Sequence, residues 1–368
     1  MMSPSLVAQL LLLGAAALLF RRATGPALAP TAAGSMVMAI GIFGLASLQQ
    51  MPAATVLSQP LTLALLLLWA FIATSYVASY LNDTFDEHLA SPVGRFAVGT
   101  WVAGTAVLAR MILLAIPDWR PLAALLGLLA ATLWIGFLVL VVRSIPAVTV
   151  RSSVSLVPGV IFLSTVSTQA LSLAIMDLFP AQRVSHSFAV GLIALGAVFY
   201  VVCAALVARS HLGTPGWSLK EDWDNTNCML HGAMSITGLA LVVSGAVPLE
   251  ATLALWIYVL GVFVTVEAIE IVRLIARIRA YGLRRGALTY RVTQWSRNFT
   301  FGMFVAFTLA LIRHGGVAEA VPLAAVQRAI VTYGPYVVVT LLIVEIAVYL
   351  DGRVRGAETG SPATSTRS

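Results

Sequence analysis

The chain is a succession of apolar stretches, each about long enough to cross a lipid bilayer. Since a helix needs about 20 apolar residues to span the hydrocarbon layer, each stretch is a candidate transmembrane helix. We predict an all-α integral membrane protein with a ten-helix core, in which short connections make neighbouring helices antiparallel. The ten spans are expected near 31–49, 60–80, 93–116, 121–142, 153–176, 185–208, 226–246, 252–276, 293–313 and 326–349.

The composition supports a membrane protein over a soluble one. Of the 368 residues, 60% are hydrophobic and 10% are charged, whereas soluble domains contain about 25% charged residues. The net charge of +7 lies mostly in the connections, so membrane topology explains it better than a nucleic-acid partner. Cys203 and Cys228 have no CxxC spacing, and we predict neither a disulfide framework, a metal site nor a cofactor.

The two ends of the chain fall outside the ten-helix core. Residues 5–20 are apolar, lack a preceding basic segment and are followed by Arg21 and Arg22, so they predict an extra N-terminal transmembrane helix and not a cleaved signal. We divide the chain into an anchor helix with its linker (1–30), the ten-helix domain (31–350) and a polar tail (351–368). The tail is rich in small polar residues and is expected to be disordered.

The distribution of basic residues predicts the orientation of the helices. Of the 22 Lys and Arg, 17 fall on the side that holds the connection after the N-terminal apolar segment, the connections after the even spans and the C-terminus. Four fall on the other side (Arg120, Arg183, Arg313 and Arg328), and Arg110 lies within a span. By the positive-inside rule, the basic side and the C-terminus are cytoplasmic in a multi-pass protein of the plasma (inner) membrane.

Small and hydroxyl residues alternate between the spans. Gly, Ser and Thr account for 31 of 109 residues in the odd spans and 17 of 116 in the even spans. One interpretation is close helix packing alone. The other is that five helical hairpins each send one helix into an inner layer while the second helix faces lipid.

Several charges within the spans need partners. Glu267 and Glu270 precede Arg273 on the eighth span, and the three-residue spacing predicts a structural ion pair between Glu270 and Arg273. Glu345 and Arg110 have no partner nearby in the sequence, so each is a candidate for pairing with another helix.

Signs of catalysis are weak. The sequence contains no HExxH, GxSxG or P-loop motif, and His231 with His186 makes an unconvincing haem pair, so we predict no enzyme. One alternative remains, a membrane-embedded, metal-dependent enzyme of lipid or prenyl transfer. It would use the acidic connections NDTFDEH (82–88) and KEDWDN (220–225). The other interpretation is that both connections are simply solvated acidic loops.

The ninth span contains a conspicuous aromatic segment, QWSRNFTFGMFVAFT (294–308). At 100° per residue, one face of a helix here carries Arg297, Phe301, Phe304 and Thr308. The roughly opposite face carries Trp295, Phe299, Gly302 and Ala306. The second face alternates rings with small residues, so a ring on it could close a narrow passage, although packing is the commoner role for such rings. Arg297 is expected to reach the cytoplasmic surface or to pair with a carboxylate.

Three segments resemble one known family. QWSRNFTFGMF (294–304) is similar to the ninth helix of the tellurite-resistance and C4-dicarboxylate transporter family, which includes plant slow anion channels; Trp295 and Phe299 have the family spacing. SPVGRFAVGTWVAG (91–104) and PGVIFLSTVSTQALSL (158–173) resemble its third and fifth helices. The chain departs from the family pattern at Ser91, Gln294 and Thr300, which suggests a divergent branch.

The resemblance, which covers residues 31–349, implies both fold and function. It implies five hairpins around a central pore, a homotrimer in membrane lipid, and a channel or secondary transporter for small anions such as chloride, nitrate, oxyanions and mono- or dicarboxylates. Phe299 is the first choice for a pore-blocking ring on the ninth helix, and Phe301 is the second. The candidates for lining the pore are Phe96, Gly99, Thr100, Ser164, Thr168, Gly232, Ser235 and Gly302.

The odd spans also suit an anion path on chemical grounds. Apart from Asp177 at the end of the fifth span, they carry no Asp or Glu. Hydroxyl groups and backbone N–H dipoles near Gly and Pro could coordinate an anion weakly enough to release it. No ATP-binding motif is present, so flux would follow an electrochemical gradient or be coupled to another ion.

Overall fold

The computed structural model describes residues 29–180, 183–318 and 320–358, and these residues form helices without any strand. The expected anchor helix at residues 5–20 lies outside the described residues. All ten predicted spans are helical, and nine helices among the described residues are long and apolar enough to cross a membrane. The tenth helix, at the ninth predicted span, is not among the nine because Arg297 and Asn298 lower its mean hydropathy.

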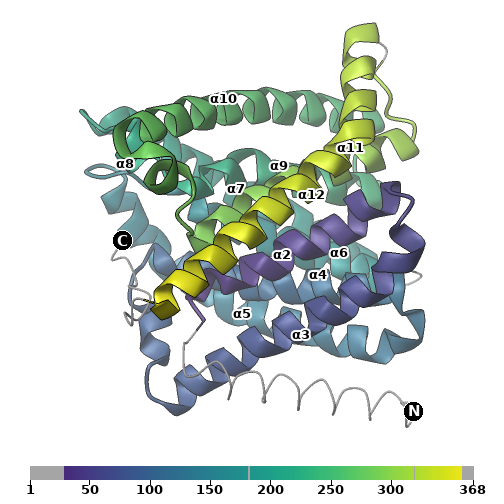
Figure 1. Cartoon of the computed structure of the whole chain (residues 1–368). Coiled ribbons are helices and arrows are strands. Elements are labelled where there is room, and N and C mark those ends of the chain that lie inside the picture. Colours follow the sequence, from purple (N-terminus) through teal and green to yellow (C-terminus); the bar gives the residue numbers. More distant parts are fainter. Residues whose placement is uncertain (1–28, 181–182, 319, 359–368) are drawn as a thin grey trace.

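The helices form five consecutive hairpins (Figure 1). Their first members are α2 (Gly34–Ile42), α4 (Gly99–Ala115), α6 (Leu163–Leu178), α9 (Met229–Ser244) and α11 (Trp295–Arg313). Their second members are α3 (Ala54–Leu81), α5 (Arg120–Arg151), α7 (Arg183–Gly213), α10 (Leu249–Ala287) and α12 (Val321–Glu358). A short helix, α8 (Leu219–Asp222), lies in the connection before α9.

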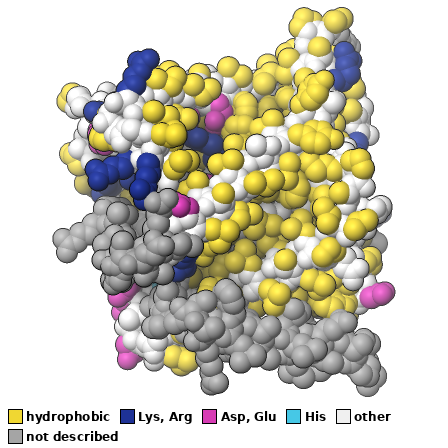
Figure 2. All heavy atoms as spheres, viewed as in Figure 1, with side chains coloured by type: hydrophobic (Ala, Val, Ile, Leu, Met, Phe, Trp, Pro, Cys, Tyr) yellow, Lys and Arg dark blue, Asp and Glu magenta, His cyan; other side chains and the backbone are white. Residues whose placement is uncertain are grey.

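The two members of each hairpin differ in burial. In the most apolar stretches of the spans containing α2, α4, α6 and α9, between 72% and 89% of the residues are buried. The corresponding values for α3, α5, α7, α10 and α12 are 22% to 33%. Figure 2 shows one face of the resulting outer surface, which is largely apolar in its described part. The first members are therefore inner helices and the second members outer helices, as the second interpretation of the Gly, Ser and Thr distribution predicted.

The inner helices form a closed ring. Contacts join α2 to α4, α4 to α6, α6 to α9, α9 to α11, and α11 back to α2. Because an outer helix returns the chain after each inner helix, all five inner helices run in the same direction. A 3-10 turn precedes each of them: Thr31–Ala33, Gly94–Val98, Gly159–Phe162, Asn225–Cys228 and Val292–Gln294. Their N-terminal ends, which carry partial positive charge, thus lie on one face of the protein.

One glycine in each segment of the ring contacts the next segment. A Cβ added to any of these glycines would lie closer than 3.0 Å to a neighbouring atom, so only Gly allows this helix spacing. The five contacts are Gly34 with Thr100, Gly99 with Leu163, Gly159 with Thr226, Gly232 with Thr300, and Gly302 with Ile42. Close helix packing therefore explains much of the glycine content of the inner spans.

Three tryptophan–threonine hydrogen bonds connect neighbouring hairpins. In each, an indole Nε1 of an outer helix donates to the Thr hydroxyl of the following inner helix at 2.9 Å. The pairs are Trp69 with Thr105, Trp134 with Thr168, and Trp256 with Thr308. These bonds fix the rotation of three outer helices against the ring.

The last outer helix is longer than predicted. α12 continues to Glu358, eight residues beyond the expected end of the ten-helix domain at residue 350. Residues 351–358, predicted to be disordered, are therefore helical. The remaining part of the predicted tail, residues 359–368, lies outside the described residues.

Candidate functional site

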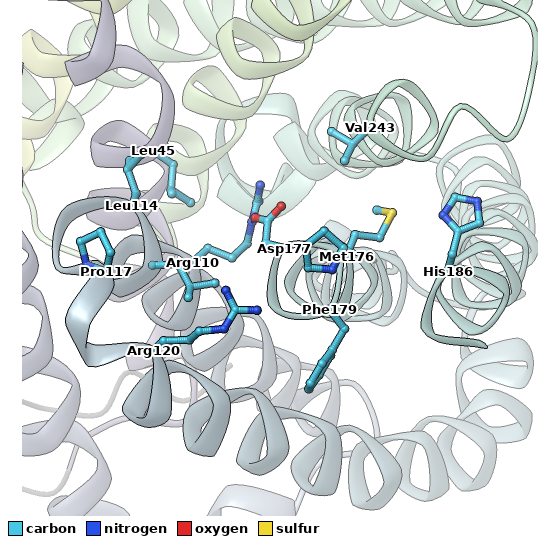
Figure 3. Close-up of a pocket in the computed structure, with 12 residues that line it drawn as sticks. Leu45, Arg110, Leu114, Pro117, Arg120, Met176, Asp177, Phe179, His186 and Val243 are labelled. Carbon is cyan, nitrogen blue, oxygen red and sulfur yellow. The ribbon is translucent and has the colours of Figure 1, made fainter. Parts of the chain in front are cut away.

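A cavity of about 650 Å³ opens where four inner helices end (Figure 3). Its lining includes Leu45, in the π-helical segment Phe43–Ser47 that follows α2, Leu114 of α4, Met176 of α6 and Val243 of α9. These residues come from four of the five members of the ring. We call it the vestibule; it lies at the C-terminal ends of the inner helices.

The vestibule carries an excess of positive charge. The Arg110 Nε lies 2.6 Å from the Asp177 Oδ2, and the two side chains point toward each other in Figure 3. This contact joins α4 to α6 and gives Arg110 the partner on another helix that the sequence called for. Arg120 also lines the vestibule and donates to the carbonyl of Leu178. The two guanidinium groups outnumber the one carboxylate, and their net positive charge offsets the partial negative charge of the surrounding helix ends.

One face of α11 contacts α10. The Arg297 Nη2 lies 2.6 Å from the Glu270 Oε2, and the Thr308 Oγ1 accepts a hydrogen bond from Trp256. The rings of Phe301 and Phe304 each lie 4.9 Å from the ring of Phe263. The face of α11 predicted to carry Arg297, Phe301, Phe304 and Thr308 is thus the face toward this outer helix. The structure places Phe301, the second-choice gate, there.

Phe299 lies on the other side of α11. Helical geometry separates it by about 180° from the centre of the face that contacts α10. On its two flanks, Gly302 contacts Ile42 of α2 and Thr300 contacts Gly232 of α9. Phe299 therefore lies between the two adjacent inner helices, and its side chain is completely buried.

The hydroxyl groups predicted to line a pore donate to their own helices. Thr100, Ser164 and Ser235 donate to carbonyl oxygens three or four residues earlier at 2.8 Å, and Thr168 does so at 2.7 Å. Ser164 and Thr168 also contact outer helices, through Cys203 of α7 and Trp134 of α5. Their O–H donors are thus already used within the protein.

The remaining lining candidates are Phe96, Gly99, Gly232 and Gly302. Phe96 is 2% exposed in the turn before α4. The three glycines contact neighbouring helices of the ring. A pore-lining role for all eight candidates stays a prediction, and the contacts of the glycines and hydroxyls give most of them a packing role as well.

A charged cluster surrounds the start of α11. The two oxygens of Glu270 contact the Arg297 Nη2 at 2.6 Å, the Arg273 Nη1 at 3.3 Å and the Trp223 Nε1 at 2.9 Å. Arg297 also lies 3.8 Å from Glu267. The expected Glu270–Arg273 contact is therefore part of a larger network, in which Arg297 ties the inner helix α11 to the outer helix α10.

The other buried titratable groups do not form the pairs considered from the sequence. The Nε2 of His231 lies 3.5 Å from the Oε1 of Glu267, near the arginine-rich end, whereas His186 lines the vestibule at the opposite end. The structure thus does not bring the two histidines together for a haem. Glu345 has no cationic partner within 4.0 Å among the described residues.

The acidic connections mostly serve local structure. Asp224 accepts hydrogen bonds from the backbone N–H and hydroxyl of Thr226, and Asp222 accepts one from the N–H of Ser218. Glu221 accepts a hydrogen bond from Tyr281. In the described part of the chain, no group of three or more His, Cys, Asp or Glu is placed to hold a metal ion.

The tryptophan–threonine bonds and the Arg110–Asp177 pair were not predicted from the sequence. The bonds had a sequence signal: a Leu-Trp dipeptide recurs in three even spans, at 68–69, 133–134 and 255–256. The Arg110–Asp177 pair had a weaker signal, since each residue lies near the same end of its inner helix. No local pattern relates the two positions, because they are 67 residues apart.

Comparison with known proteins agrees with this architecture. A family model described as a voltage-dependent anion channel (SLAC1) matches residues 29–349. The match covers all five hairpins, including the vestibule, α11 and the charged cluster. No curated protein matches the chain.

Proposed function

Because the chain belongs to the voltage-dependent anion channel family, we propose that it conducts small anions through the ring of inner helices, with Phe299 as the gate. The observation that carries this proposal is the direction of Phe299, which lies between α2 and α9. Phe301 and Phe304 instead pack on the outer helix α10. A change in the Phe299 rotamer would open or close the passage without disturbing the contacts between α11 and α10.

The electrostatics of the ring favour anions. All five inner helices direct their N-terminal ends to one side, and this arrangement of helix dipoles is favourable to negative charge there. On the other side, Arg110 and Arg120 supply positive charge at the vestibule. The helix dipoles therefore favour an anion at the N-terminal side, and the arginines counter the partial negative charge of the helix ends at the vestibule.

The middle of the path would bind anions weakly. The hydroxyl donors of Thr100, Ser164, Thr168 and Ser235 already bond to backbone carbonyls. By helical period, the residues of α11 that share the face of Phe299 are Met303 and Ala306, which are apolar. Weak coordination allows rapid release, so we favour a channel over a tightly binding carrier. Its candidate substrates are chloride, nitrate, oxyanions and small carboxylates.

We further propose the setting in which the channel acts. The arginine-rich N-terminal side of the ring, with the C-terminus of the chain, faces the cytoplasm of a plasma (inner) membrane, because 17 of the 22 Lys and Arg fall on that side. The homotrimer implied by the family resemblance is part of the same proposal, with one pore in each subunit.

Anion flux into liposomes tests the function and the gate together. Purified protein is reconstituted, and chloride, nitrate and malate uptake are compared for the wild type, Phe299→Ala and Phe301→Ala. We expect flux above that of protein-free vesicles, increased by Phe299→Ala and not by Phe301→Ala. An increase only with Phe301→Ala would assign the gate to Phe301. If all three proteins are folded and none gives flux, the proposed channel is contradicted.

A further inference from the structure

A second cavity, of about 180 Å³, lies among α10, α11, α12 and the connection between α10 and α11. We call it the arginine cavity, since guanidinium groups dominate its lining. It lies at the end of the bundle opposite the vestibule. Its charged lining residues are Glu270, Arg273, Arg277, Arg285, Arg291, Arg297 and Glu345.

The positive charges of the arginine cavity exceed the negative ones. Glu270 contacts two of the arginines, Arg273 and Arg297. The other three have no carboxylate within 4.0 Å among the residues that the structure describes, and they are Arg277, Arg285 and Arg291. Five cations face two carboxylates, so the cavity is electrostatically suited to an anion.

Buried hydrogen-bonding atoms in the cavity lack partners. The Nε of Arg273 and the Nε of Arg297 are buried donors without an acceptor within hydrogen-bond distance, since the nearest carboxylate oxygen to the Arg297 Nε, in Glu267, is 3.8 Å away. The Arg273 side chain is only 8% exposed. The Oδ1 of Asn298 and the Oε1 of Glu345 are buried acceptors without a donor. Because an unsatisfied buried polar group is costly, donors and acceptors together indicate a ligand that both accepts and donates hydrogen bonds.

The cavity also has an apolar side that faces lipid. Leu274 of α10 and Val344 of α12 line it and are 41% and 50% exposed. Both belong to outer helices, whose exposed surface is apolar. Figure 2 shows Lys and Arg side chains gathered at one end of this face, beside the apolar surface. The arginine cavity therefore lies at the boundary between basic protein surface and membrane.

We propose that the arginine cavity binds the headgroup of an anionic glycerophospholipid that carries hydroxyl groups, such as phosphatidylglycerol. The phosphodiester oxygens accept from Arg273 and Arg297, and the headgroup hydroxyls donate to Asn298 and Glu345. The acyl chains follow Leu274 and Val344 into the bilayer. Basic cavities between transmembrane helices are suited to such headgroups. Because Arg297 is two residues from Phe299, the lipid would contact the helix that carries the proposed gate.

Thermal unfolding of the purified full-length chain in neutral detergent tests the site without reference to transport. The additions are short-chain phosphatidylglycerol, short-chain phosphatidylcholine and inorganic phosphate. A ligand that binds only the folded state raises the apparent Tm. We expect phosphatidylglycerol to raise it, and the other two to leave it unchanged at equal concentration.

Two double variants with equal charge change locate the effect. Arg285→Gln with Arg291→Gln removes two exposed arginines of the cavity lining that make no ion pair in the described structure. Arg279→Gln with Arg284→Gln removes two exposed arginines of α10 outside the lining. We expect the first pair to weaken phosphatidylglycerol binding about tenfold, and the second to change it little.

The outcomes separate the possible sources of the phosphate. Equal stabilisation by inorganic phosphate would assign the cavity to a soluble anion and overturn the lipid assignment. Equal stabilisation by phosphatidylcholine, or equal loss in both double variants, would also overturn it, since the effect would then be non-specific. The Tm of each variant without lipid shows that a lost response does not come from misfolding.

Discussion

The Nη2 of Arg297 lies 2.6 Å from the Oε2 of Glu270, and Glu270 is 4% exposed. This buried contact holds the helix that carries Phe299 against α10. Replacing Glu270 with Gln removes the carboxylate that Arg297 and Arg273 share, leaving both cations without their strongest partner. We expect a loss of about 3 kcal/mol in the free energy of unfolding, typical of a broken buried pair.

Thermal or denaturant unfolding in detergent measures this loss. Glu250→Gln provides the matched control, because Glu250 is exposed at the start of the same helix. The control is expected to stay within about 0.5 kcal/mol of the wild type. Equal, small effects from both variants would show that the buried network contributes little to stability.

The glycine contacts of the inner ring predict a second set of effects. An added Cβ at Gly232 would clash with Thr300 of α11, whereas one at Gly261, on the outer helix α10, would meet no atom within 4 Å. Gly232→Ala is therefore expected to destabilise the protein by about 1–3 kcal/mol through overpacking. Gly261→Ala should be neutral or stabilising by up to about 1 kcal/mol, since Ala favours helix. A similar change in Tm for both would contradict the close approach of α9 and α11.

The tryptophan–threonine bonds lend themselves to a double-mutant cycle. Trp256→Phe removes the N–H that donates to Thr308, and Thr308→Val removes the acceptor. We expect a coupling energy of about 1 kcal/mol between the two changes in unfolding measurements. Additive effects would indicate that Trp256 acts through packing alone.

Much of the helix arrangement follows from local sequence properties. Bilayer thickness dictates the length of an apolar helix, and this is why the predicted spans agree with the helices. The 100° period was sufficient to group Arg297, Phe301, Phe304 and Thr308, and this group is the face that contacts α10. Each of these properties depends only on residues close together in the chain.

The roles of individual small residues could not be predicted in the same way. Gly and Ser are equally suitable between packed helices and beside a lumen, so Gly99 and Ser164 carried no directional signal. Their contacts with Leu163 and Cys203 depend on the rotation of whole helices. The arginine cavity was likewise hidden, because it joins residues from 225 to 345 that meet only when the helices pack. Gating by Phe299 stays a prediction.

The buried histidine beneath the arginine-rich end predicts a dependence of stability on pH. His88 follows α3 and contacts the Thr31 Oγ1 at 2.9 Å and the Ser79 Oγ at 3.2 Å, while the rings of Tyr76 and Trp101 meet its edge. Burial disfavours the imidazolium and lowers the pKa of His88 below its ordinary value of 6.5. The unfolded chain then binds a proton that the folded chain does not, so stability falls as the pH drops below 6.5.

Unfolding curves at pH 7.5 and pH 5.5 measure this effect. The Tm of the wild type is expected to be lower at pH 5.5 than at pH 7.5. This difference in Tm should be smaller in His88→Asn, which cannot titrate. The comparison uses the difference between the two pH values, so a uniform loss of stability in the variant does not disturb it. An unchanged pH dependence in His88→Asn would assign the effect to other groups.

The charge of Arg120 in the vestibule is expected to affect anion entry. Arg120 lines the vestibule without a carboxylate within 4.0 Å in the described part of the chain, so its charge is available to attract anions. Arg120→Gln should reduce chloride flux in liposomes roughly two- to fivefold at low ionic strength, because an attractive field raises the local anion concentration. Salt near 1 M should remove most of the difference, since screening then acts within about 3 Å.

The control is Arg328→Gln, which removes an exposed arginine of α12 outside the vestibule. Both variants lose one positive charge, so a general effect of net charge would lower flux equally in the two. A reduction confined to Arg120→Gln and abolished by salt would mean that anions pass through the vestibule. A reduction that persists in 1 M salt would instead mean that Arg120 holds the end of α6 in place through its bond to the Leu178 carbonyl.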